Sequence, residues 1–494
     1  MKNGSLTEHV SWLMFAKTLA FAANIALPVL LVRRLNLTEF GVYRQLFLFI
    51  STAVVVLPLG FATSAYYFLP REPTRRAETV LHIFVFNLLI GGLACAVLIL
   101  SPALLGGIFH QPALASYSNL MGPVVLLWIV SSAIETIPIA NGEMKFASVM
   151  ILSVQLTRTA IYLGAVIVFG TVRALLYAAV LQGALQTAVL WWYLASRFGA
   201  FWSRVDWPLL GRQLSYAIPL GLAGILYTVQ TDLHDYFVSN RLGAAAFALY
   251  SVGTVDIVLM GLLQEATNAV LIPHVSELQH LNDTRGIISL MSRAMRKLAA
   301  AYFPVYALLL VVAPDLISFV FTRRYVAAVP VFWINLTLLV IGIVLLDPLF
   351  RAYQEQRFFL IRLRVVLCLL LVAGLWFATT RFGAVGAITV VVGISVSERA
   401  IAAIRFGHIL GVTRADIVLL KDVGKLALAA AAAGLLTAAV HFPLRDQKPL
   451  VVLMACGVVF ALVYLAGVLL SGVVTAEEKD LVRRRFVSLG LIHA

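Results

Sequence analysis

The sequence predicts an all-α polytopic membrane protein with about fourteen transmembrane helices. Hydrophobic residues make up 62% of the 494 residues and charged residues only 12%, whereas a soluble globular chain carries about 25% charged residues. Apolar runs recur along the whole chain, and the run at 450–470 contains no charge. Because about 20 apolar residues in a helix cross a hydrocarbon core of about 30 Å, each such run is long enough to span a membrane.

Charged loops and Gly or Pro residues separate the runs and set the limits of the spans. The predicted spans are 11–32, 44–68, 80–101, 119–140, 149–169, 174–195, 214–238, 247–272, 298–321, 327–349, 361–379, 383–404, 423–441 and 450–472. The first is expected to be retained, because residues 1–11 are polar and no signal-peptide cleavage site follows. The long connection 274–297 is predicted to form an amphipathic surface helix.

The distribution of positive charge predicts how the chain is oriented. Of the 37 Lys and Arg residues, 24 lie in loops on the N-terminal side of the predicted spans or within four residues of them, and 10 in or equally close to the opposite loops. Positive loops stay in the cytoplasm, so both termini are expected there and the protein in the inner membrane. These charges are scattered over many short loops, which disfavours nucleic acid as a partner.

No sequence motif indicates catalysis or cofactor binding. The chain lacks a phosphate-binding Gly-Lys-Ser/Thr loop and a Gly-x-Ser-x-Gly elbow. Cys95, Cys368 and Cys456 lie inside apolar runs and are expected to be small buried hydrophobic residues rather than metal ligands. We therefore expect no enzyme activity, no cofactor and no metal.

An internal repeat divides the chain. Arg34-Leu35-x4-Phe40-x2-Tyr43 returns as Arg241-Leu242-x4-Phe247-x2-Tyr250, and further matches follow at offsets between 203 and 212 residues. An even number of spans per copy makes the copies parallel, and two such bundles suit alternating access around a central site. The predicted bundles are 1–200 and 201–410, followed by two additional helices and a basic tail in 411–494. The alternative is a duplicated scaffold that moves nothing.

Two stretches of the repeat resemble a known family. Phe40-Gly41-Val42-Tyr43, and the segment from Pro219 through Asp235 to Asn240-Arg241-Leu242-Gly243, are similar to Wzx-type polysaccharide flippases of the multidrug/oligosaccharidyl-lipid/polysaccharide exporter superfamily. The family often has a basic residue after that aspartate, where this chain has Tyr236. The departure weakens any role carried over to Asp235.

The resemblance implies a flippase that moves a polyprenyl-diphosphate-linked glycan, a precursor of O-antigen, capsule or exopolysaccharide, to the periplasmic leaflet. It also implies a glycan polymerase and a chain-length regulator as partners. Alternatives are a peptidoglycan lipid-precursor flippase, a multidrug exporter of the same superfamily, and a membrane glycan ligase or polymerase. The enzyme is disfavoured because no large external loop is present.

Basic residues inside the spans are candidates for binding the diphosphate. Charged groups within a membrane are costly and usually functional, and Arg binds phosphate oxygens in a fork. The candidates are Lys17, Arg44 and Arg158. Alternatives are that Lys17 reaches back to the cytoplasmic surface and that Arg44 is an interfacial anchor.

Further polar residues are candidates for the sugars and for a coupling ion. Glu265 and Asn268, together with Gln264, form a stripe suited to hydroxyl groups, and Tyr66 and Tyr227 are candidates for stacking on sugar rings. Glu135 and Asp347 occupy similar places near the ends of their spans and suggest gate or loop-anchor positions.

Asp232 and Asp235 are three residues apart and share a helix face. They are candidates for binding H+ or Na+ and coupling its gradient to transport. The alternative is that they are solvated at the interface and pair with Arg241.

Overall fold

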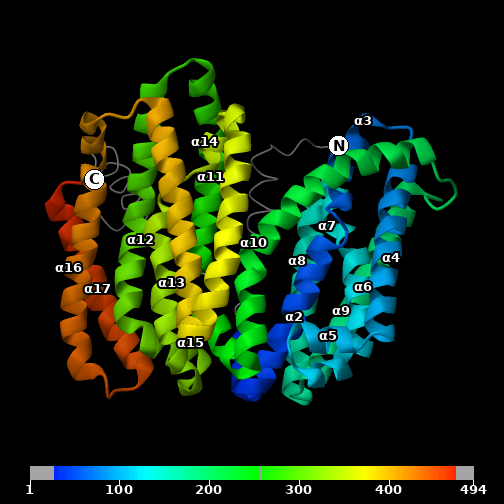
Figure 1. Cartoon of the computed structure of the whole chain (residues 1–494), viewed down its shortest axis with the longest axis horizontal. Helices are drawn as coiled ribbons and strands as arrows, with labels where there is room; N and C mark the ends of the chain where they lie inside the picture. The colour runs from blue at the N-terminus through cyan, green and yellow to red at the C-terminus, as the bar shows by residue number, and fades with distance from the viewer. Residues whose placement is uncertain (1–26, 256, 474–494) are drawn as a thin grey trace, which may run out of the picture. The chain divides into compact units, whose positions relative to one another are not determined.

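The apolar runs form long helices in the computed structural model, which describes residues 27–255 and 257–473 (Figure 1). In that part of the chain the regular structure is helical throughout, without strands. Local sequence sets several helix ends. Asn36 and Glu39 form a reciprocal capping box at the start of α2, and Thr171 caps α9. The predicted all-α multi-pass class is confirmed.

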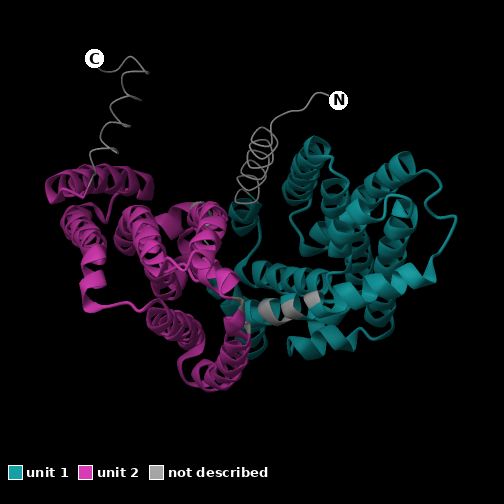
Figure 2. Ribbon diagram, turned by 90° about the horizontal axis from the view of Figure 1, so that it is seen from above, with its two compact units in different colours: residues 1–251 teal, residues 252–494 magenta. Residues whose placement is uncertain are grey.

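The chain separates into two compact units, residues 1–251 and 252–494 (Figure 2). The repeat limits predicted from the sequence, 1–200, 201–410 and 411–494, remain predictions.

The first unit contains a helical segment at 27–34 followed by helices that alternate between long spans and short connections. These are α2 (Leu37–Val56), η1 (Phe61–Ser64), α3 (Ala65–Arg71), α4 (Arg76–Leu100), α5 (Ala103–Ile108), η2 (Pro112–Tyr117), α6 (Ser118–Ser131), α7 (Ala133–Ala140), α8 (Met144–Val168), α9 (Val172–Phe198) and α10 (Trp207–Gly253), whose last residues reach the unit boundary.

The second unit begins with a polar helix and ends with the additional hairpin. Its helices are α11 (Val258–His280), α12 (Thr284–Phe321), η3 (Arg323–Ala328), α13 (Val329–Gly342), α14 (Asp347–Ala352), η4 (Gln354–Gln356), α15 (Arg357–Leu410), η5 (Arg414–Leu420), α16 (Lys421–Leu444) and α17 (Pro449–Ser471).

Ten helical stretches of the described residues are long and apolar enough to cross a membrane. One of them, Phe358–Leu410, covers the two predicted spans 361–379 and 383–404, which are separate helices that meet at Gly383, whose backbone is not helical (φ 59°, ψ −140°). The predicted surface helix 274–297 is divided: residues 274–280 end α11, and residues 284–297 form the first turns of α12, which bury Ile287 and Met291. The first predicted span, 11–32, lies mostly outside the described residues.

The predicted span 214–238 lies in α10, whereas the predicted span 247–272 begins in the last residues of α10 and continues in α11; neither helix is among the ten stretches. Polar residues in α11, including Gln264, Glu265 and Asn268, lower its hydropathy, and α10 carries Asp232 and Asp235. The helices that are the least apolar are therefore those that carry most of the polar site candidates.

The repeated Phe and Tyr residues are core residues of the first unit. Phe40, Tyr43, Phe247 and Tyr250 are all buried. Gly41, between the first two, allows α2 to approach α10 closely, because a β-carbon at this position would overlap the backbone carbonyl of Ala244. Gly41, which lies in the stretch that resembles the family, is therefore required for the close packing of these two helices.

The additional hairpin α16–α17 packs against α12 in the second unit. His441 on α16 lies 2.7 Å from the Asp315 carboxylate on α12. At the other end, Arg296 on α12 donates to the carbonyl of Val473 at 2.8 Å, and Lys425 donates to that of Ser471 at 3.1 Å. These contacts stabilise the end of α17 and fix the hairpin to the unit.

Candidate functional site

The side chain of Arg158 lies among aromatic rings in the first unit. Its guanidinium carbon is 5.0 Å from the centroid of the Trp128 ring and 5.7 Å from that of Tyr162. The ring of Phe47 lies 5.9 Å from Tyr162 and 6.1 Å from Trp128, and 4.5 Å from the Tyr43 ring. We call these four aromatic residues and Arg158 the Arg158 cluster.

Helical spacing and one hydrogen bond hold the Arg158 cluster in place. Tyr162 is four residues after Arg158 on α8, so both side chains lie on one face of the helix. Trp128 on α6 is held by its indole N–H, which donates to the carbonyl of Ala179 on α9 at 3.2 Å. Cation–π contacts of this kind stabilise a desolvated guanidinium by about 2 kcal/mol or less.

The charge of Arg158 is not neutralised by a carboxylate of the described residues. Its Nε is buried without a hydrogen-bond partner, and no ion pair is formed in the described part of the chain. Arg44 on α2 is half-buried, and both arginines lie near Tyr43. The fold thus brings together two of the three predicted cationic candidates. Lys17 lies outside the described residues.

Asp232 and Asp235 lie in a polar network between α2 and α10. Thr52 Oγ1 donates to Asp232 Oδ2 at 3.3 Å. His234 Nδ1 lies 3.3 Å from Asp235 Oδ1 and 3.0 Å from the hydroxyl of the fully buried Tyr250. The contributions of Thr52 and Tyr250 were not foreseen, because they come from sequence-distant positions.

A cavity of about 350 Å³ lies in the second unit between α11 and α14. We call it the α11–α14 pocket, and it contains the predicted pair Glu265 and Asn268. Its lining residues are Gly261, Gln264, Glu265, Asn268, Ala269, Ile272, Asp347 and Arg351. Asp347, predicted as a gate or loop anchor, is thus a pocket residue, and Arg351, which was not predicted as a site residue, lines the same cavity.

The two tyrosine candidates are not placed at these sites. Tyr66 on α3 is 48% exposed and lies near Glu135 and Thr136 of α7. The side chain of Tyr227 lies outside the described part of the structure. A role in stacking on sugars stays a prediction for both.

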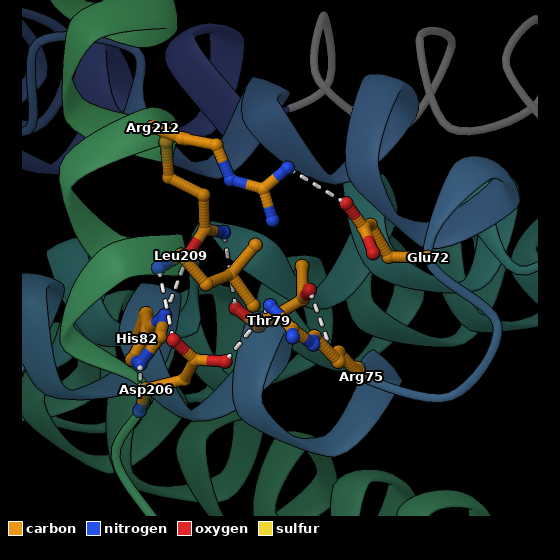
Figure 3. Close-up of polar contacts among 8 residues, drawn as sticks. Glu72, Arg75, Thr79, His82, Asp206, Leu209 and Arg212 are labelled. Atoms are coloured by element: carbon orange, nitrogen blue, oxygen red, sulfur yellow. Dashed lines mark hydrogen bonds and ion pairs between the residues drawn. The ribbon is translucent and has the colours of Figure 1, made fainter.

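A further polar network joins α4 to the start of α10 (Figure 3). Asp206 caps α10 by accepting from the Leu209 N–H at 3.0 Å, and its other oxygen lies 3.2 Å from Arg75. The Asp206 N–H donates to Nε2 of the buried His82 at 3.2 Å, and His82 Nδ1 lies 2.7 Å from Gln213 Oε1. Because Nε2 accepts, we assign the proton of a neutral imidazole to Nδ1.

A second ion pair supports the same junction: Arg212 on α10 lies 2.9 Å from Glu72, just after α3 (Figure 3). The pair is partly exposed, so its own contribution to stability is small. The network therefore depends mainly on Asp206, which serves as helix cap and as ion-pair partner at once.

Asp206→Ala is expected to lower the stability of the protein by about 0.5–2 kcal/mol, the range measured for loss of a helix N-cap. The measurement is thermal unfolding of the purified protein in detergent. Asp446→Ala is the matched control. Asp446 is exposed, and its ion pair with Arg445 is long, at 4.0 Å, so its loss should have little effect. Equal melting of the two variants would show that the Asp206 network does not hold α10.

Comparison with solved structures identifies the fold. The chain is similar to the lipid II flippase MurJ in an inward closed conformation, with a TM-score of 0.70 and 13% identity over 92% of this chain and 97% of that one. It is similar to an inward-facing multidrug resistance MATE transporter, with a TM-score of 0.61 and 13% identity over 80% and 96% of the two chains. It is also similar to a MOP superfamily transporter from Pyrococcus furiosus, with a TM-score of 0.55 and 15% identity over 81% of this chain and 95% of that one.

At these identities the likeness concerns the fold, which is that of the MOP superfamily transporters. No curated protein sequence matches this chain. The family model for polysaccharide biosynthesis proteins matches residues 30–330, more than half of the chain. That range includes the Arg158 cluster, the Asp232–Asp235 network and the α11 part of the pocket. The chain is therefore a multi-pass membrane protein that belongs to the polysaccharide biosynthesis protein family.

Proposed function

We propose that this protein is a flippase that moves a lipid-diphosphate-linked oligosaccharide from the cytoplasmic to the periplasmic leaflet by alternating access. The observation that carries the proposal is the Arg158 cluster. It combines a guanidinium without a carboxylate partner with aromatic rings, in a membrane helix. A diphosphate supplies the missing negative charge through forked hydrogen bonds. Family membership supports a glycan as the headgroup.

A multidrug exporter fits this site less well. Drugs exported by such proteins are mostly cationic, and a cation would be repelled by Arg158 and Arg44. A peptidoglycan lipid-precursor flippase remains the second candidate, because the structural likeness to the lipid II flippase extends over nearly the whole chain and lipid II also carries a diphosphate. The family match favours the polysaccharide precursor over lipid II.

The distribution of positive charge and the polar network around Asp232 and Asp235 support further proposals about orientation and ion coupling. The protein is proposed to lie in the inner membrane with both termini in the cytoplasm, because positively charged loops stay on the cytoplasmic side. Asp232 and Asp235 are proposed to bind H+ or Na+ and to couple its gradient to the conformational cycle. A glycan polymerase and a chain-length regulator are its proposed partners, and the protein itself catalyses no covalent step.

Inactivation of the gene tests the proposal and separates the candidates. Loss of the surface glycan, with accumulation of its lipid-linked precursor and normal cell growth, is the expected result. Lysis from arrested peptidoglycan synthesis would instead identify the lipid-precursor alternative. Increased sensitivity to cationic drugs with intact surface glycan would identify an exporter, and either result would overturn the proposal.

A further inference from the structure

The α11–α14 pocket presents an aligned polar surface. Its six α11 residues are spaced at three- and four-residue intervals, so they line one face of that helix. Asp347 and Arg351 are four residues apart on α14 and face the same cavity. The volume of about 350 Å³ is at the lower end of the range for ligand pockets, about 300–1,000 Å³. It suits one sugar ring rather than a whole oligosaccharide.

The pocket contains more negative than positive charge. Glu265 and Asp347 are carboxylates and Arg351 is the one cation among the lining residues. In the described residues, these three side chains form neither an ion pair nor a side-chain hydrogen bond with one another or with a neighbour. Asn268 Oδ1 is likewise buried without a hydrogen-bond partner. A buried polar atom without a partner is costly, so a ligand that donates to Asn268 Oδ1 would satisfy it, and the exposed side chains of Glu265, Asp347 and Arg351 are accessible to the same ligand.

The chemistry of these groups selects the ligand. Carboxylates accept hydrogen bonds from hydroxyl groups, the amides of Gln264 and Asn268 donate and accept, and Arg351 donates. The hydroxyl groups of a sugar ring both donate and accept, so they can form hydrogen bonds with all of these side chains. A carboxylate on that ring would face two negative side chains against one positive side chain, and like charges disfavour binding strongly.

We propose that the α11–α14 pocket binds an uncharged sugar ring of the transported glycan and excludes uronic acids. This inference rests on the proposed function and names the sugar class that the second unit selects. The negative charge of the substrate is then borne by its diphosphate, for which the Arg158 cluster is the proposed site. Selectivity arises from the repulsive element as much as from the attractive contacts.

Two water-soluble probes of the same shape test the proposal: methyl glucoside, and methyl glucuronide, in which a carboxylate replaces the hydroxymethyl group. Binding of each to the purified full-length protein is measured by ligand-observed NMR. Methyl glucoside is expected to bind at least about tenfold more tightly than methyl glucuronide. Equal affinities, tighter binding of the glucuronide, or no binding of either probe would overturn the proposal.

The variant Glu265→Gln/Asp347→Asn removes both negative charges with little change of shape. It is expected to reverse the preference, because Arg351 then remains as the only charge in the pocket. Glu277→Gln is the matched control: Glu277 is an exposed acid on the same helix outside the pocket, and its loss should leave the preference unchanged. If the double variant still prefers methyl glucoside, the two carboxylates do not determine the selectivity and the proposal is wrong.

These tests are independent of transport. Arg158→Ala should bind both probes as the wild-type protein does, because Arg158 lies in the other unit. If the probes bind as expected but a lipid-linked glycan is not moved, the proposed function fails and the pocket assignment stands. If transport is observed but the probe preference is absent, the pocket assignment fails alone.

Discussion

Cells that carry Arg158→Ala are expected to lose the surface glycan while the level of the protein in the membrane stays normal. The substitution removes the guanidinium that the proposal assigns to the diphosphate, and each hydrogen bond to a charged group contributes about 1.5–3 kcal/mol. Loss of one or two such bonds weakens binding by at least about tenfold. The measurement is surface glycan and protein level in a complemented deletion strain.

Two further arginine variants separate charge from structure. Arg158→Lys keeps the charge but not the fork, so partial activity is expected. Arg173→Ala is the matched control, because Arg173 is exposed and its guanidinium carbon lies 6.0 Å from the Tyr117 ring centroid. It should complement fully. Full complementation by both Arg158→Ala and Lys17→Ala would rule out a cationic binding site as the basis of transport.

Gly41→Val is expected to destabilise the protein by about 3 kcal/mol, at the upper end of the usual overpacking cost. The new side chain would overlap the Ala244 carbonyl, and a backbone atom cannot move aside as a side chain can. Gly221→Val should behave alike, because its β-carbon would overlap the carbonyl of Leu59. Both effects would appear as low yield and a lowered melting temperature in detergent.

Gly164→Ala provides the comparison for these glycines. No atom lies within 4 Å of the position that its β-carbon would occupy, and it stands in the interior of α8, where alanine favours the helix. Its melting temperature should equal or exceed that of the wild type. A Gly41→Val variant that melts like Gly164→Ala would contradict the close approach of α2 and α10.

The fold class and most helices could be predicted from the sequence because membrane spans are set by length and hydropathy. The additional hairpin α16–α17 followed from two apolar runs of sufficient length. The polar helix α11 was predicted only in part, because the predicted span 247–272 also includes the last residues of α10 and the connection between the two helices. The predicted helix ends were wrong where the connection is itself helical: the predicted span 298–321 is part of α12, which already begins at Thr284.

The residue types at the candidate sites were predictable, but most of their partners were not. Tyr162 lies four residues from Arg158 and is a neighbour on any helix. Trp128 reaches the same arginine, and Phe47 reaches the Trp128 and Tyr162 rings, only because tertiary packing brings residues of α6, α2 and α8 together. In the pocket, the spacing of the α11 residues predicts that they share one helix face. The position of Arg351 beside that face depends on how α14 packs against α11. Long-range contacts of this kind are fixed by tertiary packing and leave no local pattern.

The purified protein is expected to move a lipid-linked glycan across a membrane without any other protein. The measurement is transfer of a labelled polyprenyl-diphosphate oligosaccharide between leaflets of reconstituted vesicles, read by an impermeant glycan-modifying reagent. We expect transfer that requires the protein and is lost with Arg158→Ala. Transfer no faster than in protein-free vesicles, with the reconstituted protein folded, would contradict the account.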